Sequence, residues 1–367
     1  MAEDIRIGII GVGMIGKSHI NGYAKVPGAK IVAVADVNEA EATRVAAEHN
    51  IPQVFTSFRD LLALDEIDAV DVCLHNNLHS PVTIAALEAG KHVYCEKPMA
   101  GAYVDAKNMY DAAEATGRKL HIQLSTLYSK EHKTARKLIC DGALGRLYYA
   151  RSFGFRRRGR PFVDGYGTAP FVQKAQAGGG ALYDMGVYHI AQVLHLLGNP
   201  RVETVSGATH QEVPMYEHKA KEAGYDVEEM GLGFVRLAGG ISLSIEESWA
   251  AHYDNSESSK ILGAKGGLKL SPLTLFSTAG DVEYSASVDI DGTDFRWHRW
   301  TENYSAYDSS QHHWVAALQG TVELIDTAGI ALNVMLISQG IYLSQKLGRE
   351  VTADEVLEHS VSTAVEV

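Results

Sequence analysis

Residues 5–16 read IRIGIIGVGMIG, and the predicted fold of the first part of the chain follows from them. An apolar run, which predicts a buried strand, precedes a G-x-G-x-x-G pattern and then the helical pattern KSHINGYAK. In this arrangement the first glycine allows a tight turn, the second lets a pyrophosphate approach the backbone, and the third lets the helix pack on the strand. The N–H groups that start the helix face the phosphates. We therefore predict a dinucleotide-binding turn made of the run Gly11-Val12-Gly13-Met14-Ile15-Gly16.

A second predicted strand, residues 30–35, ends in Asp36, twenty residues after Gly16. A carboxylate at this strand end can accept hydrogen bonds from both adenosine ribose hydroxyls of NAD, and it repels the 2′-phosphate of NADP. The next residues, Val37 and Asn38, supply no arginine for that phosphate. We therefore predict NAD as the cofactor, with NADP less favoured, and Asp36 as a ribose-binding residue. The alternative interpretation is an ordinary βαβ turn with a solvated aspartate.

Composition limits the class of protein. A chain of 367 residues suggests two domains, and 46% hydrophobic with 21% charged residues is typical of a soluble globular protein. The formal net charge of −12 argues against a nucleic-acid partner. Three scattered cysteines indicate reduced thiols. No stretch looks long and apolar enough to span a membrane, and the N-terminus enters its first strand at once, so we expect a cytoplasmic protein without a membrane partner.

Strand-like and helix-like segments alternate through the first third of the chain. Further strands are predicted at residues 69–74, 91–95 and 119–124, and helices at 79–89 and 103–116. This alternation predicts an α/β Rossmann domain, residues 1–125, with a parallel sheet covered on both faces. Ligands of such a sheet bind outside the carboxyl ends of its strands.

The pattern changes after residue 125. Residues 201–288 are mostly strand-like and contain glycine turns typical of hairpins, and helices are predicted at 129–141, 181–198, 309–319 and 327–347. Residues 126–367 are therefore predicted to form a C-terminal α+β domain with a large, mostly antiparallel open sheet.

Two polar loops follow predicted strands of the first domain. His75-Asn76-Asn77-Leu78-His79 follows residues 69–74, and Glu96-Lys97-Pro98 follows residues 91–95. Three features together resemble the Gfo/Idh/MocA oxidoreductase family: the glycine-rich turn, the Asn-x-x-His turn, and the segment GKHVYCEKP, residues 90–98. That family includes inositol dehydrogenases and glucose–fructose oxidoreductase. The resemblance covers essentially the whole chain and implies the same two-domain architecture, in which residues 126–367 serve substrate binding and oligomerisation.

Lys97 is the first candidate catalytic residue. An ammonium at a strand end could hydrogen-bond a substrate hydroxyl and favour its alkoxide, and the resemblance assigns the catalytic role to the lysine of Glu-Lys-Pro. Glu96 could pair with Lys97 or bind the nicotinamide ribose. Asn76 could contact the same ribose, although the family usually has proline where this chain has His75. His79 belongs to the same cofactor-side loop, and a structural role is its favoured interpretation.

The family pattern Asp-x-Gly-x, followed by histidine or tyrosine, matches residues 184–188, and His189 comes next. On a regular helix Asp184 and Tyr188 share a face, whereas His189 lies about 140° from Asp184. The spacing favours Tyr188 as the proton-transferring group, with a nearby Lys97 lowering a pKa that is otherwise near 10. His189 has the better intrinsic pKa and takes the role if the helix starts late or bulges. Asp184 would orient the substrate or the acid–base residue. The side chains predicted to contact substrate here are Lys97, Asp184, Tyr188 and His189.

An arginine-rich, loop-like segment, residues 156–177, has two interpretations. It is a solvated basic loop that pairs with the acidic remainder of the chain, or a lid in which Arg156 and Arg158 bind a polyhydroxylated or anionic substrate. His312, in the segment YDSSQHHWVAAL, could line the sugar site or lie on a helix face, and we slightly favour the site. No spacing of histidine and acidic residues resembles a metal site, so no metal is predicted.

Together these features predict an NAD-dependent dehydrogenase of a sugar, cyclitol or glycoside, with hydride passing between a carbinol carbon and the nicotinamide. One alternative is a redox-neutral glycoside-cleaving or epimerising enzyme that retains its NAD. Another is a non-enzymatic NAD-binding regulator, which would not need Lys97, Asp184 and Tyr188. The apolar, strand-rich run 232–250 and the family's habit of pairing this sheet predict a homodimer or homotetramer.

Overall fold

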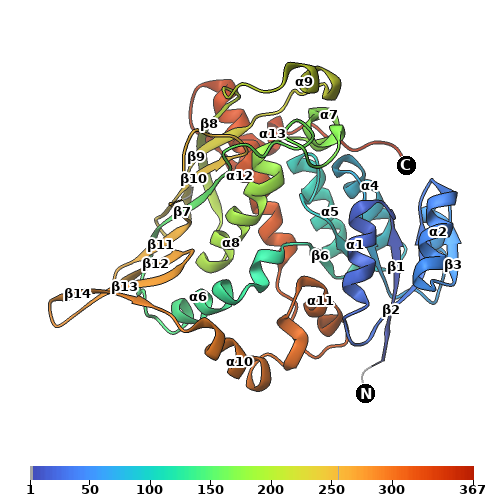
Figure 1. Cartoon of the computed structure of the whole chain (residues 1–367), viewed down its shortest axis with the longest axis horizontal. Helices are drawn as coiled ribbons and strands as arrows, with labels where there is room; N and C mark the ends of the chain where they lie inside the picture. Colours follow the sequence, from blue (N-terminus) through green and yellow to red (C-terminus); the bar gives the residue numbers. More distant parts are fainter. Residues whose placement is uncertain (1–2, 255) are drawn as a thin grey trace.

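The computed structural model describes residues 3–254 and 256–367, and two sheets organise them. In Figure 1 the first sheet and its helices lie on the right and the second sheet on the left, with the long helix α12 (Thr327–Leu347) between them. The described residues thus form the predicted α/β and α+β arrangement.

The first sheet is parallel, with strand order β3-β2-β1-β4-β5-β6. Its strands are β1 (Ile5–Ile10), β2 (Ala29–Ala35), β3 (Gln53–Phe55), β4 (Ala69–Val72), β5 (His92–Cys95) and β6 (Leu120–Ile122). Its helices are α1 (Met14–Tyr23), α2 (Glu39–His49), α3 (Phe58–Leu62), α4 (Asn76–Glu88) and α5 (Tyr103–Thr116). The strand order reverses between β1 and β4, and this switch point is where a doubly wound sheet binds its ligand.

Local sequence signals explain where these helices begin and end. The Asn38 side chain caps α2 by accepting a hydrogen bond from the Glu41 amide, and Gly117, with a φ of +64°, ends α5. Helix α4 begins at Asn76, three residues before the predicted start, and it contains Pro81. Proline has no N–H to donate to the Asn77 carbonyl, and that carbonyl accepts the Val365 amide instead (3.3 Å). The C-terminal tail thereby docks on α4.

The second sheet has the order β14-β13-β12-β11-β7-β10-β9-β8-β15. Only the pairing of β7 with β10 is parallel, as the predicted mostly antiparallel sheet requires. The strands are β7 (Leu147–Phe155), β8 (Val202–His210), β9 (Met230–Leu237), β10 (Ile241–Ser248), β11 (Lys260–Gly263), β12 (Gly266–Leu270), β13 (Leu273–Ala279), β14 (Val282–Ser287) and β15 (Val351–Thr352).

Helices of the second part include two that the sequence did not predict. Helix α9 (Glu217–Ala223) is a charged segment within the stretch predicted as mostly strand, and α10 (Ile290–Trp300) buries none of its residues. Neither shows the apolar stripe that identifies a packed helix. The remaining elements are α6 (Lys130–Cys140), α7 (Lys174–Ala177), a π-helix (Leu182–Gly186), α8 (Val187–Leu197), α11 (Ser310–Leu318), α13 (Ala353–His359) and the 3₁₀ turns Ser125–Tyr128, Ala169–Val172 and Tyr304–Tyr307.

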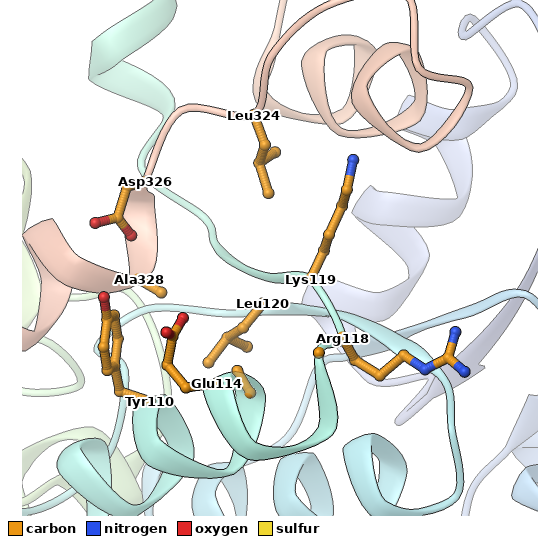
Figure 2. A pocket seen from close by; sticks show the side chains of 10 residues that line it. Tyr110, Glu114, Arg118, Lys119, Leu120, Leu324, Asp326 and Ala328 are labelled. Atoms are coloured by element: carbon orange, nitrogen blue, oxygen red, sulfur yellow. The ribbon is translucent and has the colours of Figure 1, made fainter.

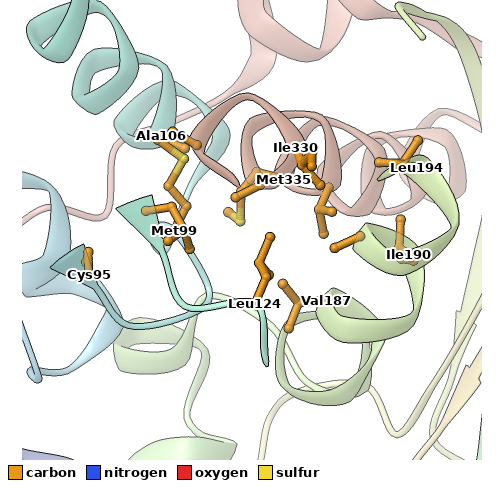
Figure 3. Packing of buried hydrophobic residues seen from close by; sticks show 14 of the residues in the cluster. Cys95, Met99, Ala106, Leu124, Val187, Ile190, Leu194, Ile330 and Met335 are labelled. Atoms are coloured by element: carbon orange, nitrogen blue, oxygen red, sulfur yellow. The ribbon is translucent and has the colours of Figure 1, made fainter. Parts of the chain in front are cut away.

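One hydrophobic core joins the two sheets. Figure 3 shows Met99 and Leu124, which follow β5 and β6, packed with Val187 of α8 and Met335 of α12. Helix α12 is long and apolar enough to cross a membrane, which corrects the expectation that no stretch of the chain is. In its apolar 18-residue segment, however, 72% of the residues are buried, and a buried core helix has the same length and composition. The predicted domain boundary at residue 125 coincides with a 3₁₀ turn directly after β6.

Candidate active site

The glycine-rich turn has the shape of a phosphate cradle. Gly11 has a φ of +92°, and a Cβ there would collide with the Cys73 carbonyl. A Cβ on Gly16 would collide with the Gly11 carbonyl, so this glycine lets α1 pack against the turn. Gly13 faces open space, and no side chain in the described part of the chain caps the first N–H groups of α1, in the turn that contains Met14 and Ile15. These groups fit a pyrophosphate such as that of NAD.

Asp36 follows β2 directly beside this turn. Its Oδ2 accepts the Val12 amide at 2.9 Å and its Oδ1 accepts the Asn38 amide at 2.9 Å. Each carboxylate oxygen can accept two hydrogen bonds, so one acceptor position on each oxygen is left for ribose hydroxyls. Asp36 therefore fits the ribose-binding role predicted for it.

Lys97 follows β5 and reaches across to the second part of the chain. Its Nζ donates to the backbone carbonyl of Asp184 at 2.9 Å and to its carboxylate Oδ1 at 3.0 Å. Trp249 Nε1 donates to the other carboxylate oxygen at 3.0 Å. Burial alone would lower the pKa of Lys97 and raise that of Asp184, but the charges and hydrogen bonds around each group, the partner's charge first among them, together outweigh burial in both. The pKa of Lys97 is raised and that of Asp184 lowered, so both are charged at neutral pH.

The segment that carries Asp184 is a π-helix, Leu182–Gly186, which runs directly into α8. A π-turn adds a residue to the helical repeat, so the regular four-residue spacing assumed from the sequence does not hold here. The bulge named above as favouring His189 is therefore present. The structure nevertheless places the Tyr188 ring against Lys97, whose Nζ lies 4.8 Å from the ring centroid.

Tyr188 points its hydroxyl at Gln123, the residue that follows β6 (Oη to Oε1, 3.4 Å). Gln123 stands at the carboxyl end of its strand, as Lys97 does, so the phenol lies at the ligand-binding edge of the first sheet. Burial raises the pKa of Tyr188 by more than the Lys97 charge lowers it. Lys97 thus lowers the pKa of Tyr188 as predicted, but by less than burial raises it.

His189 is bonded to Glu247 of β10, through Nδ1 and Oε2 at 2.8 Å. Burial lowers the pKa of His189, but the charge of Glu247 and its hydrogen bond together outweigh burial, and the net pKa is raised. Glu247 is fully buried, whereas the His189 side chain is 32% exposed. Sequence reasoning missed Glu247, although it continues the buried alternation of Leu243 and Ile245 on β10, where a carboxylate is unusual.

Three of the four arginines in residues 156–160 lie in different environments. Arg156 Nη1 donates to the Tyr166 hydroxyl at 2.6 Å and lies 3.9 Å from Asp184 Oδ2, so it reaches the site. Arg158 does not: it stacks on the Tyr216 ring, 5.0 Å from the centroid. Arg160 is fully buried and bonds Glu229 at 2.9 Å, which anchors the segment. The lid interpretation thus suits Arg156, and the interpretation as ion pairs within the chain suits Arg160.

Three predicted cofactor-side residues use their polar atoms within the protein. Asn76 Nδ2 donates to the Ala177 carbonyl at 2.8 Å. His79 is fully buried and bonds the Pro98 and Leu74 carbonyls with its two ring nitrogens, so a structural role fits it and a cofactor contact from its ring does not. Glu96 accepts the Lys97 backbone amide at 2.8 Å, not its ammonium, and its other oxygen is bonded to a histidine described below.

His312 does not reach this site. Its Nδ1 lies 2.8 Å from Ser309 Oγ and its Nε2 lies 3.2 Å from the Lys25 carbonyl, beyond the C-terminal end of α1. Helix α11, which carries His312, packs against α1. The glycine turn lies at the opposite, N-terminal end of α1. The expectation that His312 lines the substrate site is therefore wrong.

A hollow outside this site is lined by charged residues near the end of α5 and the start of α12. Figure 2 shows Glu114, Asp326 and Tyr110 on one side of it and Lys119 on the other. None of the site residues predicted from the sequence lines it. Among the described residues, one group of possible metal ligands has its ligand atoms within 4.8 Å: His19, Asp71 and Cys73. These three side chains are hydrogen-bonded to one another: His19 Nδ1 lies 2.9 Å from Asp71 Oδ2, and Cys73 Sγ lies 3.3 Å from Asp71 Oδ1.

Comparison with known families identifies the chain. A model described as an oxidoreductase family with an NAD-binding Rossmann fold matches residues 5–124, and the GFO/IDH/MocA C-terminal domain matches residues 132–269. The chain belongs to the Gfo/Idh/MocA oxidoreductase family. The predicted family, its NAD-binding Rossmann domain and its mostly antiparallel second sheet are thereby confirmed.

Curated Gfo/Idh/MocA relatives act on sugars and cyclitols by name. D-glucoside 3-dehydrogenase of Escherichia coli (strain K12) is 29% identical over 75% of this chain and 80% of its own. Inositol 2-dehydrogenase of Salmonella paratyphi B is 24% identical over 78% and 80%. The solved levoglucosan dehydrogenase complex with NADH shares the fold, with a TM-score of 0.78 at 22% identity over 96% of this chain and 99% of that one.

Proposed function

We propose that this protein is an NAD-dependent dehydrogenase that oxidises a carbinol of a sugar, cyclitol or glycoside. The observation that carries the proposal is the Lys97–Asp184 ion pair beside Tyr188, at the carboxyl edge of an NAD-binding sheet. The names of the relatives support the substrate class, since glucosides and inositols share a ring carbinol.

Lys97 would hold the reacting hydroxyl. A buried ammonium stabilises negative charge that develops on the substrate oxygen, and Asp184 fixes its direction through two hydrogen bonds. NAD, when bound, supplies the hydride acceptor, and the chain supplies orientation and proton transfer. The position of Lys97 after β5 suits this, because nicotinamide rings bind at that edge of the sheet.

Tyr188 is the proton-transferring group of this proposal, because its ring contacts Lys97 and its phenol lies at the strand ends. His189 is a second candidate, and its bond to Glu247 supports it. A buried carboxylate on one ring nitrogen fixes the tautomer and leaves the other nitrogen for proton transfer. The two candidates differ in pKa, and the pH dependence of the reaction separates them.

A panel of sugars, glycosides and cyclitols, followed at the NADH absorbance with NAD and NADP in parallel, tests the proposal. We expect NADH to accumulate with at least one ring polyol. Product formation without NADH accumulation would support the redox-neutral alternative with retained NAD. If NAD binds but no member of the panel reacts or is altered, the non-enzymatic regulator is supported.

We further propose that residues 1–125 form the cofactor-binding domain, that residues 126–367 form the substrate-binding and oligomerisation domain, and that the chain forms a homodimer or homotetramer. The second sheet carries large exposed side chains on β7, β9 and β13, namely Tyr148, Phe234 and Phe276. A contiguous exposed apolar patch on a monomer marks a candidate interface with another protein chain. Light scattering at micromolar concentration should give at least twice 39.8 kDa, and a 39.8 kDa particle would contradict this.

A further inference from the structure

A second ionic cluster includes Glu96, the residue that precedes the proposed catalytic Lys97. His19 of α1 sits between two carboxylates: its Nδ1 lies 2.9 Å from Asp71 Oδ2 and its Nε2 lies 2.8 Å from Glu96 Oε1. The side chains of His19 and Glu96 are about 90% buried and that of Asp71 is fully buried. An ionised carboxylate only accepts hydrogen bonds, so both ring nitrogens must donate, and the ring is an imidazolium.

The surroundings of His19 favour that charged form. The groups that face the cluster are two acids, a thiol and two phenols, namely Asp71, Glu96, Cys73, Tyr23 and Tyr94. The Cys73 thiol lies 3.3 Å from both His19 Nδ1 and Asp71 Oδ1. Burial alone would lower the pKa of His19, but the Asp71 charge and the other charges and hydrogen bonds around the ring together outweigh burial and place the pKa well above its usual range. Burial raises the pKa of the Cys73 thiol, so it stays neutral.

Glu96 connects this cluster to the active site. One of its oxygens is bonded to His19, and the other accepts the backbone amide of Lys97 at 2.8 Å. His19 lies one and a half turns from the first residue of α1, whose N-terminus forms the phosphate cradle. A chain of hydrogen bonds therefore runs from the cofactor-binding helix through His19 and Glu96 to the backbone of Lys97.

We propose that His19, as an imidazolium clamped between Asp71 and Glu96, is a positioning residue that fixes the Lys97 backbone relative to the cofactor-binding helix. The functional part of this inference rests on the proposed dehydrogenase activity. A charge-assisted bond from a rigid ring is roughly twice as strong as a neutral one, so it holds Glu96 in one orientation. Misplacing a reacting group by about 1 Å can cost 10²-fold in rate.

The charge of His19 can be measured without any activity. In the full-length protein labelled with ¹⁵N-histidine, the His19 resonances are assigned by their loss in His19→Gln. We expect both ring nitrogens to be protonated at pH 8 and to stay so to pH 9. A neutral ring at pH 8, or a bound metal ion at one equivalent per chain, would overturn the proposal.

Two variants separate positioning from mere stability. His19→Gln leaves two buried carboxylates without their cation, and we expect it to lower the melting temperature or prevent folding. In His19→Gln with Asp71→Asn, the net charge of the cluster is kept at −1, because one cation and one anion are both replaced by amides. We expect this double variant to fold and to bind NAD within about threefold of the unmodified protein, with kcat lowered about 10- to 100-fold.

If His19 had only a structural role, a different result is expected. The double variant, in which the charge balance is restored, would then regain kcat along with stability, and that outcome would overturn the proposal. His312→Gln is the matched control, since this histidine contacts the C-terminal end of the same helix and should leave both unchanged. If the unmodified protein turns over no substrate, the proposed dehydrogenase fails, but the NMR measurement still decides whether His19 is clamped as an imidazolium.

Discussion

The cofactor side and the substrate side of the site are built in different ways. The proposed cofactor side comes from one continuous stretch, Gly11 to Asp36, and it offers mostly backbone N–H groups and one carboxylate. The substrate side joins Lys97 after β5, Asp184 of the π-helix and Trp249 after β10, which are far apart in the chain. A contiguous loop can be recognised by its spacing, whereas a site assembled by side chains depends on how distant elements pack.

The helix phase makes this difference concrete. At the glycine turn, close backbone contacts explain Gly11 and Gly16, and the open space at Gly13 suits the approach of a pyrophosphate. At Asp184, the π-turn changes which side chains share a face, and a regular helical repeat gives a misleading geometry. Substitutions on the two sides should therefore differ in kind: those on the substrate side should change turnover, and those on the cofactor side should change cofactor affinity.

The largest expected effect is at Lys97. Lys97→Ala removes the ammonium that would stabilise the substrate oxyanion, so turnover should fall by about 10⁴-fold or more. NAD affinity, measured by calorimetry, should stay within about threefold, because the lysine side chain faces Asp184 and not the glycine turn. A Lys97→Ala protein that lost NAD binding to the same extent as turnover would contradict the separation of the two sides.

Tyr188 and His189 should differ from each other. Tyr188→Phe removes only the phenolic oxygen and should lower turnover by about 10²–10⁴-fold, the range for losing a positioned acid or base. His189→Asn should cost much less, because that ring is turned to Glu247 of the second sheet. If steady-state kinetics show the larger loss of turnover in His189→Asn, then His189 is the proton-transferring residue. The π-turn would in that case have rotated His189, and not Tyr188, toward the substrate.

The pH dependence gives an independent test of the same pair. Oxidation requires the acceptor to be deprotonated, and burial raises the pKa of Tyr188 above its usual value near 10. The oxidation rate should therefore keep rising with pH beyond pH 9, and Tyr188→Phe should remove that rise. Glu247 raises the pKa of His189 from 6.5, so a histidine acceptor would instead give a rate that rises and then levels off at lower pH.

The sequence predicted the first sheet and the cofactor turn well because their signals are local. It placed α5 and α12 at their observed ends, because a glycine follows each of them and both carry apolar faces. It did not find Glu247 or Trp249 as partners of the site, since their roles arise only when β10 packs beside the π-helix. His312 was misplaced for the same reason: its helix lies along α1, which the local pattern does not reveal.

A smaller effect is expected at Asp36 on the cofactor side. Asp36→Ala removes an acceptor for the adenosine ribose, and hydrogen bonds to charged groups contribute about 1.5–3 kcal/mol. The dissociation constant for NAD should therefore rise by about 10- to 100-fold, and that for NADP should rise less or fall. Asn38→Ala, which alters only the neighbouring helix cap, is the control. Equal use of NAD and NADP by the unmodified protein would contradict the role of Asp36.

The smallest expected effect separates two arginines of one loop. Arg156 contacts Tyr166 and lies 3.9 Å from Asp184, but 43% of its side chain is exposed, so solvent screens its charge. Arg156→Ala should therefore raise KM for substrate by about tenfold, with kcat changed less, since a group that binds ground state and transition state alike acts on KM. Arg158→Ala should change neither constant, because that guanidinium stacks on Tyr216 outside the site. Equal losses in the two variants would mean that the loop acts through its net charge and not through the contact of Arg156 with Asp184.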